Sequence, residues 1–172
     1  NFPDSATVWA RNSLLVPVGV ILLIPAWAGL VDLYHASPWW LMYVFALVWG
    51  ADSGAYFAGR AFGKHKLAPN VSPGKTIEGF VGGVLTTAVL IIAVAVYREL
   101  SAVRLMAFLG LSLLTVLASV LGDLLESMIK RQAGVKDSGN IFPGHGGALD
   151  RIDSLTAAAP IFALGWWLAG GF

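Results

Sequence analysis

Five long apolar stretches, separated by short polar segments, dominate the pattern of the chain. Each is close to the roughly 20 residues that an α-helix needs to cross the hydrocarbon core of a bilayer. We therefore expect an all-α, polytopic membrane helix bundle with about five transmembrane helices, forming a single domain over 1–172. The expected spans are 13–33, 39–57, 77–97, 105–125 and 155–172.

Composition agrees with a membrane protein and excludes several classes of site. Hydrophobic residues make up 57% of the chain and charged residues 12%, whereas a soluble domain carries about a quarter charged residues. The net charge of +1 gives no bulk basic field, so we expect no nucleic-acid partner. The absence of cysteine excludes disulfides, thiolate metal sites and cysteine nucleophiles.

Positive charge predicts the orientation of the bundle. Nine of the 11 Lys and Arg residues precede the first span or fall in the second-third and fourth-fifth connections, which five spans place on one side. Arg98 and Arg104 fall on the opposite side. Lys and Arg are enriched in cytoplasmic loops, so the side with nine is predicted to be cytoplasmic. The nine are Arg11, Arg60, Lys64, Lys66, Lys75, Lys130, Arg131, Lys136 and Arg151.

Acidic residues interrupt the ends of three spans. An unpaired carboxylate is costly inside a membrane, so Asp52, Glu78, Asp123 and Glu126 should face protein or water. On the fourth span, offsets of four and seven place Asp123, Ser127 and Lys130 on one helix face. Because Asp123 lies deepest, we expect a bound cation or a buried partner to compensate its charge.

The last polar segment is rich in glycine and ends in two acids. Its glycines and proline allow the backbone to approach a ligand closely. Asp150 and Asp153, three residues apart, would share one face of a helix start, where they could simply cap the helix. Alternatively, they could meet Asp123 and form an all-oxygen site suited to Mg²⁺. We expect His145 to contact phosphate or substrate.

The other polar segment, 59–79, is basic. Its Pro-Gly-Lys-Thr run, 73–76, resembles part of a P-loop, but Pro69 stands where that motif needs glycine and no strand is expected before it. We expect instead a basic loop and a helix start near Thr76, which together favour polyanions. Positive-inside charge alone would also explain the lysines.

Read together, these segments resemble the signature of the CDP-diacylglycerol synthase (phosphatidate cytidylyltransferase) family. The similarity rests on Ser127 to Arg131, Lys136 to Gly139, Phe142 to Gly147 and Asp150 to Asp153. Asp52-Ser53, the Gly-Arg-x-x-Gly-Lys-His-Lys stretch from Gly59 and the Ser-Pro-x-Lys-x-x-Glu-Gly stretch from Ser72 also look like this family. The resemblance thus covers most of the chain.

The resemblance implies a nucleotidyltransferase that moves CMP from CTP to phosphatidic acid and releases pyrophosphate. It implies Mg²⁺ at Asp123 and Asp150, with Asp153 adjacent, and leaves open a second cation, monovalent or divalent. The implied catalytic residues are Asp123, Asp150, Lys130 and Arg131. The implied substrate-binding residues are Asp52, Ser53, Lys64, Ser72, Lys75, Ser127, Lys136, Asp137 and His145.

The resemblance also implies a cellular setting. We expect an integral protein of the bacterial inner membrane, a homodimer whose active site faces the cytoplasm. The sequence begins with Asn1 rather than Met, and the family usually carries further N-terminal helices, so we expect a longer natural protein.

The residue types fit direct transfer between two phosphates. A phosphomonoester has a second pKa of about 6, so the lipid phosphate is ionised and needs no general base. We expect in-line attack without a covalent enzyme intermediate, with cations neutralising the repulsion between substrates. Two alternatives remain open: a CTP-dependent polyprenol or lipid-alcohol kinase, and a transporter using Asp52, Asp123 and Asp150 along its path.

Overall fold

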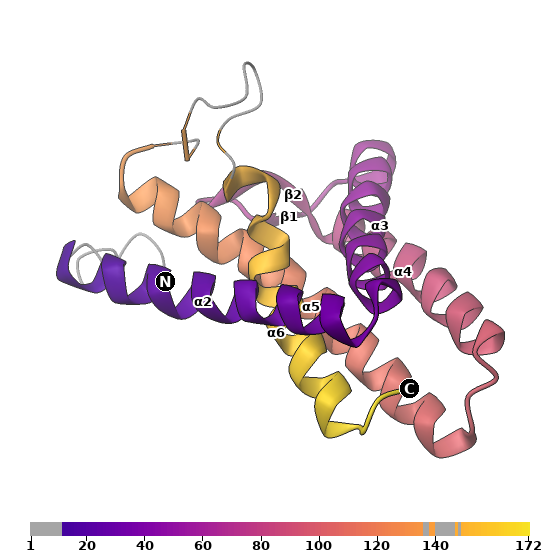
Figure 1. Ribbon diagram of the computed structural model, residues 1–172. Helices are drawn as coiled ribbons and strands as arrows, with labels where there is room; N and C mark the ends of the chain where they lie inside the picture. The colour runs from indigo at the N-terminus through magenta and orange to yellow at the C-terminus, as the bar shows by residue number, and fades with distance from the viewer. Residues whose placement is uncertain (1–11, 136–137, 140–146, 148) are drawn as a thin grey trace.

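The computed structural model describes residues 12–135, 138–139, 147 and 149–172, with side chains described from residue 17 onward. In that part of the chain, five α-helices form most of the fold (Figure 1). A 3₁₀ turn, η1, precedes the last helix, and two short strands separate the second and third of these helices. The helices are α2 (Asn12–Ala36), α3 (Pro38–Phe62), α4 (Ile77–Tyr97), α5 (Ala102–Gln132) and α6 (Asp153–Leu168); η1 is Leu149–Arg151, and the strands are β1 (Lys66–Ala68) and β2 (Ser72–Thr76).

The expected helical membrane bundle is confirmed. Helices α2 to α5 are each long and apolar enough to cross a membrane by length and composition. Helix α6 has 16 residues, about 24 Å, and ends at Leu168 rather than at the predicted Phe172. It ends early because Gly170 and Gly171 adopt left-handed backbone conformations, with φ of 72° and 79°, that close the helix.

The ends of α3 and α4 follow from local side-chain chemistry. Ser37 precedes α3 and its Oγ accepts a hydrogen bond from the amide of Trp39, while Pro38 starts the helix where no amide donor is needed. Thr76 caps α4 in the same way, accepting from the Gly79 amide at 3.1 Å. The predicted helix start near Thr76 is therefore confirmed.

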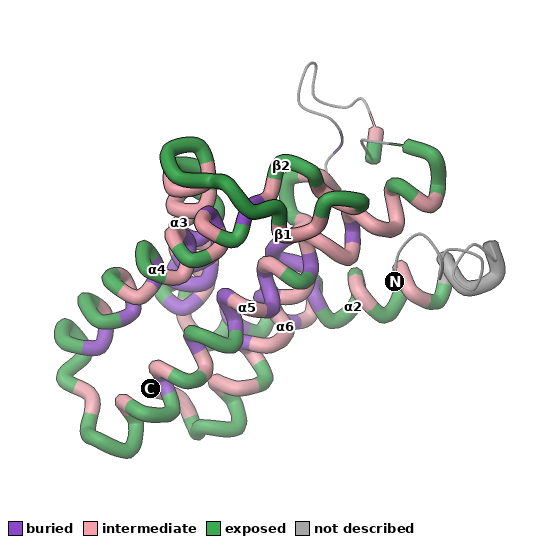
Figure 2. The backbone as a smooth tube through the Cα atoms, turned by 180° about the vertical axis from the view of Figure 1, so that it is seen from behind, coloured by how far each residue is buried: buried purple, intermediate pink, exposed green. Residues whose placement is uncertain are grey.

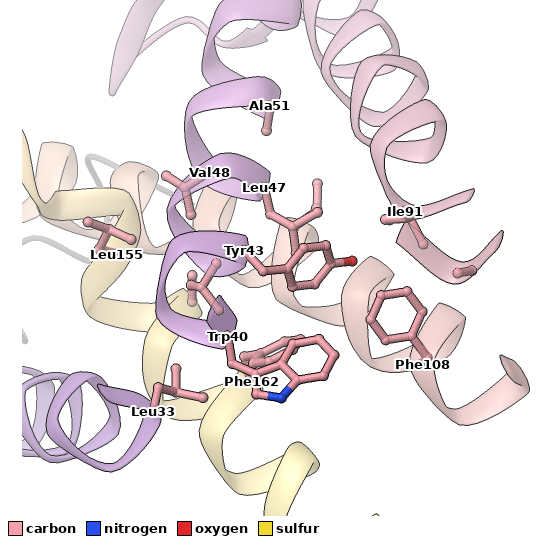
Figure 3. Packing of buried hydrophobic residues seen from close by; sticks show 14 residues of the cluster. Leu33, Trp40, Tyr43, Leu47, Val48, Ala51, Ile91, Phe108, Leu155 and Phe162 are labelled. Atoms are coloured by element: carbon pink, nitrogen blue, oxygen red, sulfur yellow. The ribbon is translucent and has the colours of Figure 1, made fainter. Parts of the chain in front are cut away.

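An aromatic cluster lies where α3, α5 and α6 meet (Figure 3). Trp40, Tyr43, Phe108 and Phe162 are buried there, and Tyr43 stacks on Phe108 with ring centroids 5.3 Å apart. The Tyr43 hydroxyl and the Ser112 Oγ, 2.7 Å apart, satisfy each other.

Much of each helix surface is exposed (Figure 2), and many of the exposed residues are large and hydrophobic. Val89 on α4 is 70% exposed and Val103 on α5 is 82% exposed. In water such faces would be unfavourable, whereas in a bilayer they contact lipid chains. The distribution of buried and exposed residues is that of an integral membrane protein.

Helices α3 and α4 approach closely because small residues line their contact. A Cβ added at Gly83 would lie 2.7 Å from the Ala51 carbonyl oxygen, and one at Gly79 would lie 2.8 Å from that of Ala55. Small residues at such contacts let membrane helices pack backbone against backbone. This packing brings the carboxyl end of α3 beside the amino end of α4.

The basic segment between α3 and α4 folds into a β-hairpin, although its sequence predicted a loop without strands. Strands β1 and β2 pair antiparallel, with Lys66 opposite Thr76 and Ala68 opposite Ser72. The run 73–76 lies within β2, so it forms a strand and not the phosphate-binding loop of a P-loop. Such short strands, one containing Pro73 and Gly74, carry little periodic signal of their own.

Candidate active site

A cavity of about 440 Å³ lies between α3, α4, α5 and the hairpin. Its charged lining residues are Asp52 and Arg60 from α3, Lys75 from β2 and Asp123 from α5. The rest of its wall is largely apolar, including Ala51, Ala55, Phe80, Val84, Val116 and Val120. The cavity thus combines a charged group with an apolar wall built from membrane helices.

Lys75 is the cavity cation that pairs with Asp123. Its Nζ lies 2.5 Å from Oδ2 of Asp123, and both side chains are about three quarters buried, with 25% and 22% exposed. Asp52 and Asp153 lie close enough that the charges of Lys75 and Asp123 act on both. One ammonium therefore faces three carboxylates.

Asp150 joins the end of α5 to both sides of the glycine-rich segment. Its Oδ1 accepts a hydrogen bond from Lys130 Nζ at 2.5 Å. Its Oδ2 accepts from the amide and the hydroxyl of Ser138, at 2.8 and 2.9 Å, and from the amide of Gly147 at 2.8 Å. Burial raises the pKa of Asp150, but these hydrogen bonds outweigh burial and hold the pKa below its ordinary value.

Lys130 and Ser127 lie on the face of α5 that carries Asp123. Lys130 Nζ lies 3.1 Å from Oε1 of Glu126, one turn earlier, so it binds two acids at once. Ser127 Oγ donates to Oδ1 of Asp123 at 3.3 Å. The predicted stripe of Asp123, Ser127 and Lys130 is therefore present, although its cation pairs with Glu126 and Asp150 rather than with Asp123.

Asp150 and Asp153 lie on successive elements and not on one helix start. Asp150 belongs to η1, and Asp153 is the first residue of α6, where its Oδ1 accepts from the Ser154 amide at 2.7 Å. Burial, and then the negative charge of Asp123, raise the pKa of Asp153 above its ordinary value. Asp153 therefore belongs to the electrostatic group of Asp123, and Asp150 to that of Lys130.

The donor chemistry of the site suits Mg²⁺, which prefers carboxylate and water oxygens. Asp52, Asp123 and Asp153 bring more negative charge together than Lys75 neutralises. Among the residues that the structure describes, however, no three His, Cys, Asp or Glu side chains form a group ready to hold a metal ion. Lys75 and Lys130 instead contact Asp123 and Asp150 directly, so the assignment of metal to Asp123, Asp150 and Asp153 stays a prediction.

The other predicted site residues lie either outside the cavity lining or outside the described part of the chain. Arg131 is exposed, and its Nε contacts the Val71 carbonyl oxygen of the hairpin at 3.4 Å. Ser53, Lys64 and Ser72 do not line the cavity, although Lys64 and Ser72 belong to the segment that covers it. The remaining predicted residues, Lys136, Asp137 and His145, lie outside the described part of the chain.

Several residues of the site were not predicted as such. Arg60 and Tyr56 line the cavity from α3, and Glu126 shares Lys130 with Asp150. The spacing of four between Glu126 and Lys130 was the available signal for that pair. Ser138 lies in the quoted Lys-Asp-Ser-Gly stretch, but only the fold shows that it donates twice to Asp150.

Comparison with known proteins gives consistent matches over most of the chain. A sequence model of the cytidylyltransferase family matches residues 3–168. The phosphatidate cytidylyltransferase of Haemophilus influenzae is 51% identical over 95% of this chain and 61% of the relative. That of Pseudomonas aeruginosa is 51% identical over 98% of this chain and 63% of the relative, and that of Bacillus subtilis 42% identical over 90% and 60%. The chain thus spans about three fifths of the length of these relatives.

Proposed function

The chain belongs to the cytidylyltransferase family, and from this membership we propose that the protein transfers CMP from CTP to phosphatidic acid, forming CDP-diacylglycerol and pyrophosphate. The names of the relatives support this choice of substrates. The observation that carries the proposal within the structure is the cavity, which places Lys75, Asp123 and Asp52 against an apolar wall. A lipid phosphate requires this combination, because its headgroup is charged and its chains remain in the bilayer.

The reaction joins two phosphates. A phosphate oxygen of phosphatidic acid attacks the α-phosphorus of CTP and forms a new P–O–P bond. The bond from the α-phosphorus to the bridging oxygen of the β-phosphate breaks, and its electron pair leaves with pyrophosphate. Because the attacking phosphate is ionised near neutral pH, no side chain has to remove a proton from it.

The protein's own residues supply charge and orientation. Lys75 and Arg60 reach the cavity, where their charge would offset the repulsion between two anionic substrates. Lys130 lies at the same end of α5, held between Glu126 and Asp150. Arg131 would act less directly, because it is exposed and contacts the hairpin backbone.

We propose Mg²⁺ as the cofactor, with Asp123 and Asp150 as its protein ligands and Asp153 adjacent. When bound, it would neutralise phosphate oxygens as charge develops on the leaving pyrophosphate. The grouped carboxylates around Lys75 support this assignment.

The proposed setting is the bacterial inner membrane, with the site facing the cytoplasm. The bacterial relatives and the positive residues at the hairpin end support it. The homodimer remains a prediction that cross-linking in membranes can test. The absence of a nucleic-acid partner also remains a prediction.

Labelled nucleotide tests the activity. With phosphatidic acid in proteoliposomes, label from the α-phosphate of CTP should appear in the lipid product, and label from the γ-phosphate should appear only in released pyrophosphate. Transfer of γ-label to lipid would instead indicate a lipid kinase. Without label transfer, the proposed reaction would be wrong.

Removal of magnesium tests the cofactor separately. Mg²⁺ at about 100 times its dissociation constant should stabilise the folded protein by about 2.7 kcal/mol, seen as a higher unfolding temperature that EDTA reverses. Asp123→Asn should abolish this response, whereas Asp32→Asn, on the exposed face of α2, should retain it. An Asp123→Asn protein that responds to Mg²⁺ like the wild type would exclude Asp123 as a ligand.

A further inference from the structure

At the base of the β-hairpin, residues just before β1 are bound by a carboxylate that the proposed reaction does not use. Glu78, in the first turn of α4, accepts hydrogen bonds from the Lys64 amide at 3.1 Å and from the His65 amide at 3.2 Å. Its Oε1 also lies 2.6 Å from Nδ1 of His65. The Ile77 amide donates to the His65 carbonyl at 2.9 Å. Residues just before β1 are therefore bound to residues just after β2.

Thr76, at the end of β2, is held in place at the base of the hairpin. It is buried, and its Oγ1 caps α4 through the Gly79 amide. A Cβ added at Gly59 or at Gly79 would lie only 3.0 Å from that Oγ1. Thr76 therefore packs against the backbones of α3 and α4, with no room for side chains between them.

The fixed position of Thr76 determines where Lys75 points. Successive side chains in a strand face opposite sides, so Lys75 must point away from the face that Thr76 presents to α3 and α4. In that direction lies α5, where Lys75 contacts Asp123. The direction of the Lys75 side chain thus depends on the base of the hairpin.

We propose that Glu78 is a positioning residue, which closes the base of the hairpin and thereby holds Lys75 at Asp123 in the cavity. This proposal rests on the proposed function only for its effect on turnover, because the position of Lys75 can be measured without substrate. An acid in the first turn of a helix also favours the helix dipole. That role requires no contact with Lys64 or His65. It therefore predicts no change in the reactivity of Lys75 when Glu78 is replaced, whereas the positioning role predicts an increase.

Lysine reactivity provides the direct test. In the full-length protein in membranes, the rate of acylation of Lys75 by a small amine reagent is compared with that of Lys66, an exposed lysine of the same hairpin. Glu78→Ala should raise the Lys75 rate relative to Lys66 by about fivefold, because the ammonium is held less often at Asp123. Glu78→Gln retains an acceptor oxygen for the backbone amides and should raise it by less than about twofold.

Turnover should follow the same order. Glu78→Ala should lower kcat by about tenfold with little change in KM for CTP, and Glu78→Gln should restore most of kcat. Glu99→Gln, which removes a carboxylate from the α4–α5 turn at the other end of α4, should leave both measurements unchanged (Figure 1).

The outcomes separate the two proposals. An unchanged ratio of Lys75 to Lys66 acylation in a folded Glu78→Ala protein would overturn the positioning role, whatever the activity. If Glu78→Ala does not fold, Glu78→Asp takes its place, because it keeps the charge at the helix start but shortens the side chain that reaches the Lys64 and His65 amides. An unchanged ratio in that variant would overturn the positioning role equally. A wild-type protein that transfers no CMP, with the labelling result as expected, would refute the proposed function alone.

Discussion

At the scale of single residues, the site is organised by two lysines that each hold an acid of a neighbouring segment. Lys75 joins the hairpin to α5 through Asp123, and Lys130 joins α5 to η1 through Asp150. Charged groups that are largely withdrawn from water are costly unless paired, so each lysine stabilises the fold locally as well as shaping the site.

Lys75→Ala should lower CMP transfer by at least about tenfold, equivalent to about 1.4 kcal/mol in the barrier. The reason is the loss of the cation that lines the cavity beside Asp123. Lys66→Ala, an exposed position in the same hairpin, serves as the control and should stay near wild type. Equal rates for the two variants would show that Lys75 has no part in CMP transfer. Its positive charge would then serve only the orientation of the protein in the membrane.

Asp150→Asn should loosen Ser138 and Gly147 more than the bundle. The amide retains one acceptor but loses the charge that faces Lys130 and attracts three hydrogen bonds from Ser138 and Gly147. Hydrogen exchange at the Ser138 and Gly147 amides should accelerate by about tenfold, while amides in the middle of α5 stay protected. Ser127→Ala, nearby on α5, should not change exchange at those two amides.

At the scale of elements, the contact between α3 and α4 positions the site. The hairpin connects these two helices (Figure 1). Their separation therefore determines where Lys75 and Asp52 lie relative to α5. Glycine is needed at these contacts because the two helix backbones approach closely, and not because the glycines adopt unusual backbone angles.

Gly83→Ala should therefore be destabilising by about 1–3 kcal/mol, since its Cβ would lie 2.7 Å from the Ala51 carbonyl oxygen and force the helices apart. Gly110→Ala in α5, where a Cβ meets nothing within 4 Å, is the matched control. It should be neutral or slightly stabilising, because alanine favours helix over glycine. Thermal unfolding in detergent measures both, and a Gly83→Ala protein as stable as Gly110→Ala would contradict the packing argument.

At the scale of the whole molecule, the polar elements gather at one end. The hairpin and η1 lie together at the end of the bundle that carries the cavity, and the α4–α5 turn and the carboxyl terminus lie at the opposite end (Figure 1). The Lys and Arg residues follow the same division, which predicts the sidedness of the protein.

Single cysteines in this cysteine-free chain test that sidedness. Lys66→Cys and Ser138→Cys should react with an impermeant thiol reagent from the cytoplasmic face, and Ser37→Cys and Ser101→Cys from the opposite face. Reaction of Lys66→Cys and Ser138→Cys from different faces would separate the hairpin from Asp150 and remove the shared site.

Much of this protein was predictable because its signals are local or periodic. Apolar runs predicted the membrane helices, and the four-residue spacing on α5 predicted the stripe of Asp123, Ser127 and Lys130. The expectation that Asp123 needs a compensating partner was also correct, although the partner is Lys75 in this structure. The metal assignment came from the family resemblance and stays a prediction.

The tertiary structure alone decided which charges meet. Lys75 and Asp123 are far apart in the chain, as are Lys130 and Asp150, and no spacing rule relates residues of different elements. The hairpin was hidden for a similar reason: its short strands are stabilised by Glu78, by Thr76 between glycine backbones and by contacts to α5, not by their own propensity. Local sequence determines helices in a membrane, where every backbone group must bond within its own segment. The pairing of charges at their ends depends on how those helices pack.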